Sequence, residues 1–340
     1  MTGKPGSRPV NGLAIQPVQI VQAICEGPGK ADFLKNIRSS FRKEGLANAV
    51  KARDSSFLFD WLMHCFSYQG VSDAIAAAYI LEHGNATYLD LERSFQGDEP
   101  ICSKLADFEA FRGCGYNKTS RSCNNAEKYS MCALPNLNLR KGQLNQAAYS
   151  LYLFVRDVCG GDLFGFIDVC LAEADLPGHP DRLAIMRNAL TDRLLLIFGV
   201  AEKILSMSFA DLLIGADPRR KKWVEVGASM IAIDSLVHNF LRRAGLHYKY
   251  GTDHSFGSAC YGPDGCANII DQIARQIDCS KFDRTYPIYF PRFIQHSIWR
   301  FCSEAHGGLC NGRAIDDQDR CVQKDCTNFD TCGRVILKPA

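Results

Sequence analysis

The sequence predicts an all-α protein, and two observations carry this prediction. Apolar residues recur with the three- and four-residue spacing of amphipathic helices through much of the chain. No series of segments shows the two-residue alternation of half-buried strands, and no repeat of fixed period is visible. With 340 residues and 46% hydrophobic content, the chain can form one large or two medium-sized domains. We expect two helical subdomains that carry cysteine-rich loops.

Individual helices can be predicted from their start signals and apolar stripes. At 72–82, Ser72 and Asp73 precede a run of strong helix formers, as at the capped start of a helix. At 144–158, apolar residues follow the i, i+3, i+4, i+7 pattern of a face that packs on a core. The same pattern predicts further helices at residues 182–198, 202–214, 232–243, 268–277 and 292–302.

The pattern divides the chain into four segments. Residues 1–100 are expected to be a helical segment whose first part, 1–20, forms a flexible arm because it is rich in proline, glycine and serine. Residues 101–140 form a polar, cysteine-bearing insert with little apolar periodicity. Residues 141–245 are the best-patterned helical core, and residues 246–340 are a C-terminal helical segment with a cysteine cluster.

The charge balance excludes a polybasic, histone-like protein. The chain has 39 Lys and Arg against 37 Asp and Glu, a formal net charge of +2. A local basic face is still sufficient to contact the phosphates of a nucleic acid. No apolar run reaches the ~18–20 residues that cross a bilayer, and no apolar h-region follows the N-terminus. We expect no membrane partner and a cytoplasmic location.

The 16 cysteines are numerous for a chain of this expected location. In a reducing compartment, clustered cysteines indicate a metal or iron–sulfur site rather than disulfides. The C-terminal set is Cys310, Cys321, Cys326 and Cys332. Four thiolates in a loop-rich stretch suit either a 4Fe-4S cluster or tetrahedral zinc, and free thiols are the remaining alternative. The peptide after Cys321 is too polar to be anchored by burial, which favours a metal.

A second cysteine set lies in the insert. Its members are Cys102, Cys114, Cys123 and Cys132. Their spacers are longer than the two-residue spacer of a zinc knuckle, so this set predicts a second zinc site only by its clustering. Cys260 and Cys266 flank a Gly-Pro-Asp-Gly turn, where they could pair with each other or bind a metal. His238 is interpreted as a packing histidine that could alternatively influence a nearby carboxylate.

Two segments of the helical core carry the candidate chemistry. A short turn at Gly199-Val200-Ala201 separates two predicted helices, and the second begins near Glu202 and Lys203. Such a turn exposes backbone N–H groups that can bind a phosphate oxygen. Further on, Asp234 follows an apolar run at the start of a helix that ends on two arginines. For each residue alone, a solvated surface lysine and a capping aspartate are the ordinary interpretations.

Taken together, these segments resemble the helix-hairpin-helix (HhH-GPD) DNA glycosylases, whose hairpin reads L-x-G-V-G-x-K and is followed by an apolar-Asp-x-x-V segment. The resemblance covers about residues 141–245, and this chain would be a divergent member. Phe198 replaces the usual proline and Ala201 replaces the second glycine. Because alanine is disfavoured at positive φ, the change at Ala201 predicts a different turn shape or a weaker grip on phosphate.

The resemblance implies a base-excision glycosylase with AP-lyase activity. Asp234 would stabilise the oxocarbenium character that develops on the sugar as the N-glycosidic bond breaks. Lys203 matches the catalytic lysine of the bifunctional members, which implies a Schiff base with C1′ followed by β-elimination. The target base would first be flipped out of the duplex. A monofunctional enzyme that uses water is the alternative chemistry.

The residues expected to contact DNA lie in three places. The hairpin contributes Gly199 and Ala201, and a basic loop contributes Arg219, Arg220, Lys221 and Lys222. At the start of the predicted 144–158 helix, Gln143 and Asn145 could read a base edge or fill the gap left by a flipped base. An exposed turn and simple capping groups are the competing interpretations.

The expected partner is double-stranded DNA with a damaged or modified base, bound by a monomer that associates with the nucleoid. One alternative is an anti-phage glycosylase that excises a hypermodified viral base, for example glucosylated hydroxymethylcytosine. Another is a non-catalytic, metal-stabilised DNA-binding protein. A metal protein unrelated to DNA is the third.

Overall fold

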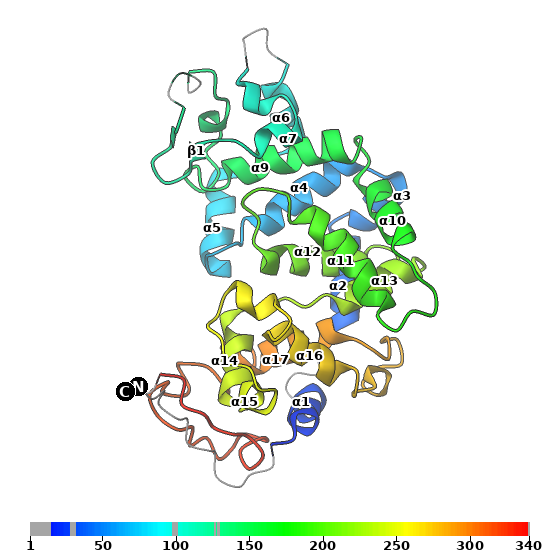
Figure 1. Ribbon diagram of the computed structural model, residues 1–340, viewed down its shortest axis with the longest axis vertical. Coiled ribbons are helices and arrows are strands. Elements are labelled where there is room, and N and C mark those ends of the chain that lie inside the picture. Colours follow the sequence, from blue (N-terminus) through cyan, green and yellow to red (C-terminus); the bar gives the residue numbers. More distant parts are fainter. Residues whose placement is uncertain (1–14, 28–31, 97–100, 126, 128–129, 339–340) are drawn as a thin grey trace, which may run out of the picture. The chain divides into compact units, whose positions relative to one another are not determined.

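The computed structural model describes residues 15–27, 32–96, 101–125, 127 and 130–338 (Figure 1). Within these residues the protein is almost entirely helical, which confirms the predicted all-α class. The described strands form one short antiparallel hairpin, β1 (Tyr116–Asn117) with β2 (Ser122–Cys123). Residues 1–14 of the expected arm lie outside the described residues, whereas 17–20 belong to the first helix.

The chain forms two compact units that are discontinuous in sequence. The described residues up to 34 join those from 228 onwards in one unit, which we call the terminal unit. Residues 35–227 form the other, the central unit. The predicted core segment 141–245 contributes to both. No helix in the described parts of the chain is long and apolar enough to cross a membrane.

The terminal unit is built around one C-terminal helix. Its elements are α1 (Pro17–Glu26), α14 (Ser235–Arg243), α15 (Leu246–Lys249), the 3-10 turn η4 (Ser258–Tyr261), α16 (Cys266–Ala274), the 3-10 turn η5 (Cys279–Lys281) and α17 (Pro291–Cys302). Helix α17 packs against α1, α14 and α16 (Figure 1). Its buried face includes Phe293, Ile298 and Phe301, and Phe33 and Tyr286 add aromatic contacts around Phe293. Helix α14 is thus positioned by its packing against α17.

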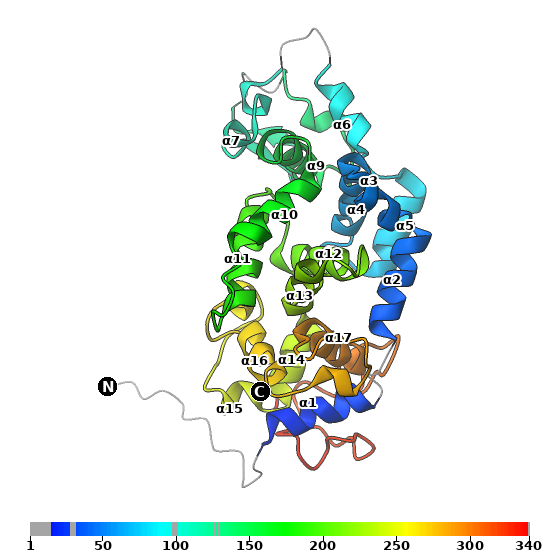
Figure 2. The same cartoon turned by 90° about the vertical axis from the view of Figure 1, so that its right-hand side faces the viewer.

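The central unit contains the remaining described helices. Helices α2 and α13 cross the boundary between the two units and are assigned to the central unit, which holds most of their residues. Its elements are α2 (Phe33–Lys43), α3 (Leu46–Ala52), α4 (Ser55–Phe66), α5 (Asp73–His83), α6 (Tyr88–Ser94), η1 (Ser103–Leu105), α7 (Phe108–Phe111), η2 (Leu134–Asn136), α9 (Asn145–Leu153), the π-turn η3 (Phe154–Val158), α10 (Leu163–Glu173), α11 (Arg182–Leu194), α12 (Glu202–Gly215) and α13 (Lys221–Ser229). Figure 2 shows α9, α10 and α11 on one side of this unit and α2, α4 and α5 on the other.

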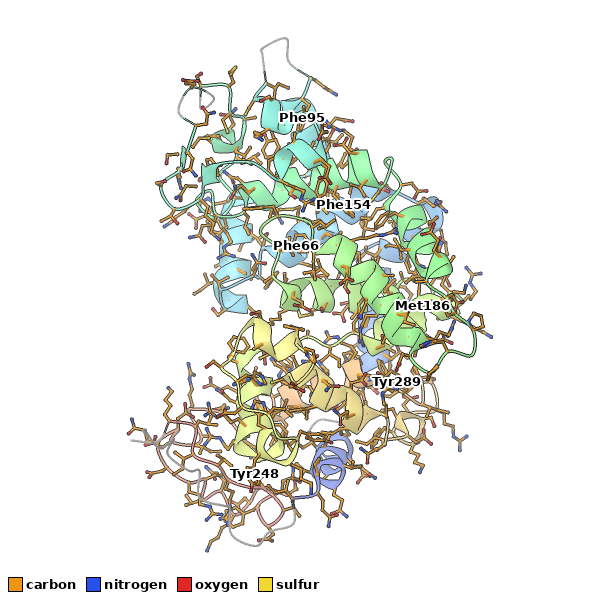
Figure 3. All side chains as sticks on the ribbon, in the orientation of Figure 1. Phe66, Phe95, Phe154, Met186, Tyr248 and Tyr289 are labelled. Carbon is orange, nitrogen blue, oxygen red and sulfur yellow. The ribbon has the colours of Figure 1, made fainter. Side chains whose placement is uncertain are left out.

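The core of the central unit surrounds α9, which is buried along its whole length. Phe66 and Phe154 lie in this interior (Figure 3), and Phe154 packs edge-on against Phe108. Helices α12 and α13 approach closely at Gly227, where a Cβ atom would lie 2.8 Å from the Leu213 Cβ atom. Glycine is therefore required at 227 to keep α13 against α12.

The observed helices follow the predicted ones closely. The helix predicted at 72–82 is α5, and the Ser72 side chain caps it by accepting a hydrogen bond from the Ile75 N–H. The helix predicted at 232–243 begins later, at Ser235, because Asp234 takes an extended conformation and caps it. The predicted 144–158 helix is α9 continued by a π-turn.

Candidate functional site

The turn between α11 and α12 reverses the chain at a left-handed glycine. Gly199 has a φ of 78°, which glycine adopts without steric cost. Ala201 has φ −78° and ψ 144°, which is ordinary extended backbone, and it is the N-cap of α12. The alanine at the second glycine position of the hairpin pattern therefore introduces no backbone strain.

One side chain from outside the turn determines its shape. The Gln69 amide donates to the Gly199 carbonyl oxygen at 2.7 Å and accepts from the Ala201 N–H at 2.7 Å. Arg140 in turn donates to the Gln69 carbonyl oxygen. Since the Ala201 N–H is already bonded, a phosphate at this turn would have to use the later N–H groups of α12, which no side chain caps.

The two candidate catalytic residues belong to different units. Lys203 lies in the first turn of α12 in the central unit, and its side chain is exposed. Asp234 lies in the terminal unit, is half-buried, and accepts a 2.9 Å hydrogen bond from the Val237 N–H through Oδ1. Each side chain is thus placed at a helix N-terminus, and capping fixes the direction of the Asp234 carboxylate.

Most of the basic run is paired with carboxylates of the central unit. The ion pairs are Arg219–Asp217 at 3.1 Å, Arg220–Asp168 at 2.9 Å and Lys222–Asp175 at 2.8 Å. The Arg220 guanidinium also lies 4.4 Å from the centre of the Trp223 ring. Arg182 and Lys222 lower the pKa of Asp175 to about 2. Lys221 is exposed at the start of α13, and none of these three ion pairs involves it.

Gln143 and Asn145 take different positions at the start of α9. Gln143 is exposed and follows three left-handed residues, Arg140, Lys141 and Gly142. Two of these are not glycine, so the loop that presents Gln143 stores backbone strain. Asn145 is buried and uses its amide to hold the preceding loop, with bonds to Leu134 O, Leu137 O and Leu139 N. Asn145 thus positions this loop, while Gln143 projects from it.

The predicted cysteine set of the insert comes together in space. Cys102, Cys114, Cys123 and Cys132 all line one cavity of about 320 Å³. Burial raises the pKa of both Cys114 and Cys132. The Gln146 amide lies 4.0 Å from the Cys114 sulfur, and Gln146 also donates to the Tyr116 carbonyl oxygen. The four cysteines thus surround one cavity.

The C-terminal cysteine set also lines a common cavity. Its members Cys310, Cys321, Cys326 and Cys332 share this lining with Arg243. Arg243 is 2% exposed and forms a 2.6 Å ion pair with Asp317. A hydrogen bond from the neighbouring Cys302 thiol, reinforced by Arg243, lowers the pKa of Cys310. Each cysteine set thus gathers around one cavity, and a metal at either set stays a prediction.

A third group of ligands combines histidine with cysteine. It lies in the terminal unit, and we call it the His/Cys cluster. His238 is in α14, His247 in α15 and His254 in the following loop, while Cys260 is in η4 and Cys266 begins α16. Four ligand atoms, from His238, His247, His254 and Cys266, lie within 4.8 Å of one another. Within the described residues, no other group of three or more metal-ligating side chains is as compact.

The Cys266 sulfur is at the centre of this group. It lies 3.3 Å from each of His238 Nδ1, His247 Nε2 and His254 Nε2. The Cys260 sulfur lies 3.5 Å from His238 Nδ1. His238, His247 and both cysteines are buried, whereas His254 is partly exposed. The five side chains come from α14, α15, η4 and α16 and from the loop between α15 and η4.

Hydrogen bonding and burial shift the pKa values of three members of the cluster. A hydrogen bond from Cys266 holds the pKa of the Cys260 thiol well below its usual range, and the pKa of Cys266 is raised by the same bond. Burial, followed by the neighbouring His238, lowers the pKa of His247 to about 4. His247 is therefore a neutral imidazole at neutral pH, which is the form that binds metals.

Comparisons with protein-family models, with curated proteins and with solved structures gave no match. The chemistry of this chain is therefore inferred from its own residues.

The structure also shows what the sequence interpretation missed. His238 was expected to be a packing histidine, and it is instead a member of the His/Cys cluster. The histidines His247 and His254 are not indicated by any sequence pattern. Of the two alternatives for the cysteine pair, the structure favours a metal at Cys266, and the Cys260 sulfur lies beside the same group. The sequence signal for this cluster is the local density of histidines. Three of the chain's 8 histidines lie at residues 238–254, just before these two cysteines.

Proposed function

We propose that the protein is a DNA glycosylase that removes a damaged or modified base by cleaving its N-glycosidic bond. One observation carries this proposal. The left-handed Gly199 turn leads directly into α12, whose first turn presents the exposed Lys203 side chain. A helix N-terminus with a nearby cation is suited to a DNA phosphate and to the sugar beside it.

The chemistry follows from the two candidate residues. After the base is flipped, the Lys203 amine attacks C1′, the C1′–N bond breaks and the base leaves with the bonding electrons and a proton. The carboxylate of Asp234 stabilises the positive charge that develops on the sugar. The C1′–O4′ bond of the resulting aminal then breaks, O4′ takes up a proton and the amine nitrogen forms a Schiff base with C1′. Loss of a proton from C2′ then expels the 3′-phosphate by β-elimination, which cleaves the strand. If water is the nucleophile instead, Asp234 accepts its proton and an abasic site remains.

The cysteine sets have a structural role in this proposal. Metal bound between Cys310 and Cys332 would hold a polar C-terminal loop against α14 and α1, since this cavity is also lined by Phe240 and Ile20. Four thiolates can hold either an iron–sulfur cluster or a tetrahedral zinc ion. The visible absorbance of the purified protein and its iron and zinc content decide between the two.

A non-catalytic DNA-binding protein is the second candidate. It is favoured by the capping role of Asp234, which explains this residue without any chemistry. The anti-phage alternative uses the same bond cleavage as the first proposal and differs in the base, a hypermodified viral base in place of a damaged one.

Borohydride trapping on a panel of modified duplexes tests these candidates together. The panel carries oxidised purines, alkylated bases, oxidised pyrimidines and glucosylated hydroxymethylcytosine. The bifunctional proposal expects a covalent adduct with the wild type and with Lys51→Ala, which alters an exposed lysine of α3, but none with Lys203→Ala. Base release without an adduct, lost in Asp234→Asn, indicates the monofunctional enzyme. DNA binding without any product, unchanged in both variants, supports the non-catalytic protein.

A further inference from the structure

The His/Cys cluster lies outside the residues that the proposed glycosylase chemistry uses. We infer that it is a closed, structural zinc site in which His238, His247, His254 and Cys266 are the ligands, and that the ion holds the start of α14 in place.

The sulfur–nitrogen distances match tetrahedral coordination. Zinc bonds are about 2.0–2.1 Å to histidine nitrogen and about 2.3 Å to thiolate sulfur, so a tetrahedron separates the nitrogen and sulfur ligands by roughly 3.5 Å. The Cys266 sulfur lies 3.3 Å from a nitrogen of each of the three histidines. Ligands that are already at this separation need little movement to bind one ion.

The donor set selects the metal class. Three imidazole nitrogens with one thiolate are typical of zinc, whereas magnesium and calcium prefer oxygen ligands. Four protein ligands leave no coordination position for a substrate or a reactive water, as in structural sites. His238 and His247 are each 3% exposed and Cys266 is 0% exposed, so the ion would be shielded from solvent. The Cys260 thiol lies beside the set and contacts the Cys266 sulfur.

The site would fix α14 through two independent links. His238 lies one turn into α14, and its N–H donates to the Asp234 carbonyl oxygen at 3.0 Å. Tyr261, the residue after Cys260, accepts a 2.9 Å hydrogen bond from the Ile233 N–H through its hydroxyl. An ion bound to His238 therefore holds the backbone after Asp234 directly. It reaches Ile233, before Asp234, through Cys260, whose thiol contacts the Cys266 ligand and which precedes Tyr261. Asp234 would be positioned by a metal that it does not contact.

The first test is metal content. We expect full-length wild-type protein, purified with zinc supplied, to contain one more zinc per chain than the His254→Ala variant. His254 is the partly exposed ligand, so its removal disturbs the core least. His83→Ala, which alters an exposed histidine in the central unit, should keep the wild-type content. His254→Cys should also keep it, because thiolate replaces imidazole as a zinc ligand. Equal zinc content in His254→Ala and wild type would overturn the site.

Cobalt substitution identifies the ligands without relying on folding of the alanine variant. In the cobalt-loaded proteins, His254→Cys should increase the thiolate-to-cobalt charge-transfer absorbance relative to wild type, since a second sulfur joins the set. An unchanged spectrum would mean that residue 254 is not a ligand.

Hydrogen exchange then tests the effect on α14. The Val237 and His238 amides should exchange on the order of tenfold faster in His254→Ala than in wild type or His254→Cys. Zinc loss with unchanged exchange would refute the positioning role. The link to Asp234 chemistry rests on the proposed function, but neither readout requires activity. An inactive protein that shows both effects would therefore contradict the glycosylase and leave the zinc site standing.

Discussion

His238 lies one helical turn after Asp234, and its backbone N–H donates a 3.0 Å hydrogen bond to the Asp234 carbonyl oxygen. A member of the His/Cys cluster and the residue proposed for bond cleavage thus belong to the same first turn of α14. The Asp234 side chain also bonds to this turn, because its Oδ1 atom accepts a hydrogen bond from the Val237 N–H. A substitution in this turn can therefore affect both the order of α14 and the proposed bond cleavage. A variant that changes only one of these properties is needed to tell them apart.

Asp234 allows this separation, because asparagine also caps helices. Asp234→Ala should lower the free energy of unfolding by about 1 kcal/mol through loss of the cap, while Asp234→Asn should change it by much less. Both variants remove the carboxylate and should abolish base release. Urea denaturation and product analysis measure the two effects. Base release that survives in Asp234→Asn would remove Asp234 from the chemistry.

Gln69 should control the turn that leads into α12. Gln69→Ala removes two hydrogen bonds, to Gly199 O and Ala201 N, and should cost on the order of 1–3 kcal/mol in unfolding free energy. It should also weaken DNA binding, since the turn would no longer be held in one shape. Gln276→Ala is the matched control, because the Gln276 amide bonds only to the preceding turn of its own chain segment. Equal DNA affinity in Gln69→Ala and the control would show that the turn does not contact DNA.

Within the basic run 219–222, we expect Lys221 to contact DNA and Arg220 to stabilise the fold. Lys221→Ala should reduce the slope of log affinity against log salt by about 1, the change expected for one lost phosphate contact. Arg220→Ala should instead reduce stability, because Arg220 pairs with Asp168 and stacks on Trp223. Salt titrations of binding and denaturation curves distinguish these outcomes. A slope that does not change in Lys221→Ala would place the DNA on another surface.

The ion pair between Arg243 and Asp317 should be essential to the C-terminal loop. Arg243 is 2% exposed, so Asp317→Ala would leave a buried charge without its carboxylate. Breaking a buried pair in this way costs about 3–5 kcal/mol. Denaturation of the variant measures the loss, and Asp319→Ala in the same loop serves as the control. A loss no greater than that of the control would mean that the loop can rearrange around Arg243.

His296 should make the terminal unit sensitive to acid. Burial and the neighbouring Arg292 and Arg300 hold its pKa well below 6.5 in the folded state. Above the unfolded value both states are neutral, so stability does not depend on this group. As the pH falls below that value, the unfolded state binds a proton that the folded state refuses, and the free energy of unfolding decreases.

The measurement is the difference in unfolding free energy between about pH 8 and about pH 5.5. This difference should be smaller in His296→Gln than in the wild type, because glutamine does not titrate. His83→Gln, at an exposed position, should leave it unchanged. An identical pH dependence in His296→Gln and wild type would assign the acid sensitivity to other groups.

The sequence by itself determined the helical class, the approximate helix positions and the two cysteine sets. These features depend on local patterns, because an amphipathic stripe or a cap such as Ser72 is complete within a few residues. The cysteine sets were also visible, since their members lie close together along the chain. Each of these signals can be recognised without knowing which helices pack together.

Only the tertiary structure decided the partners of the polar side chains. Arg220 and Lys222 looked like available phosphate ligands, but Asp168 and Asp175 reach them from α10 and the loop after it. Asn145 is used entirely by buried backbone groups. Desolvation makes unpaired buried polar groups costly, so the fold selects their partners from distant segments, and no local pattern records the choice.

The His/Cys cluster shows the same limit most clearly. His238, His247 and His254 are separated by irregular intervals, and only the packing of α14, α15 and α16 brings their nitrogens to one sulfur. A ligand set assembled from several elements depends on how the elements turn and pack. Helical periodicity fixes which face of α14 is buried, whereas the tertiary contacts decide that His238 meets Cys266 there.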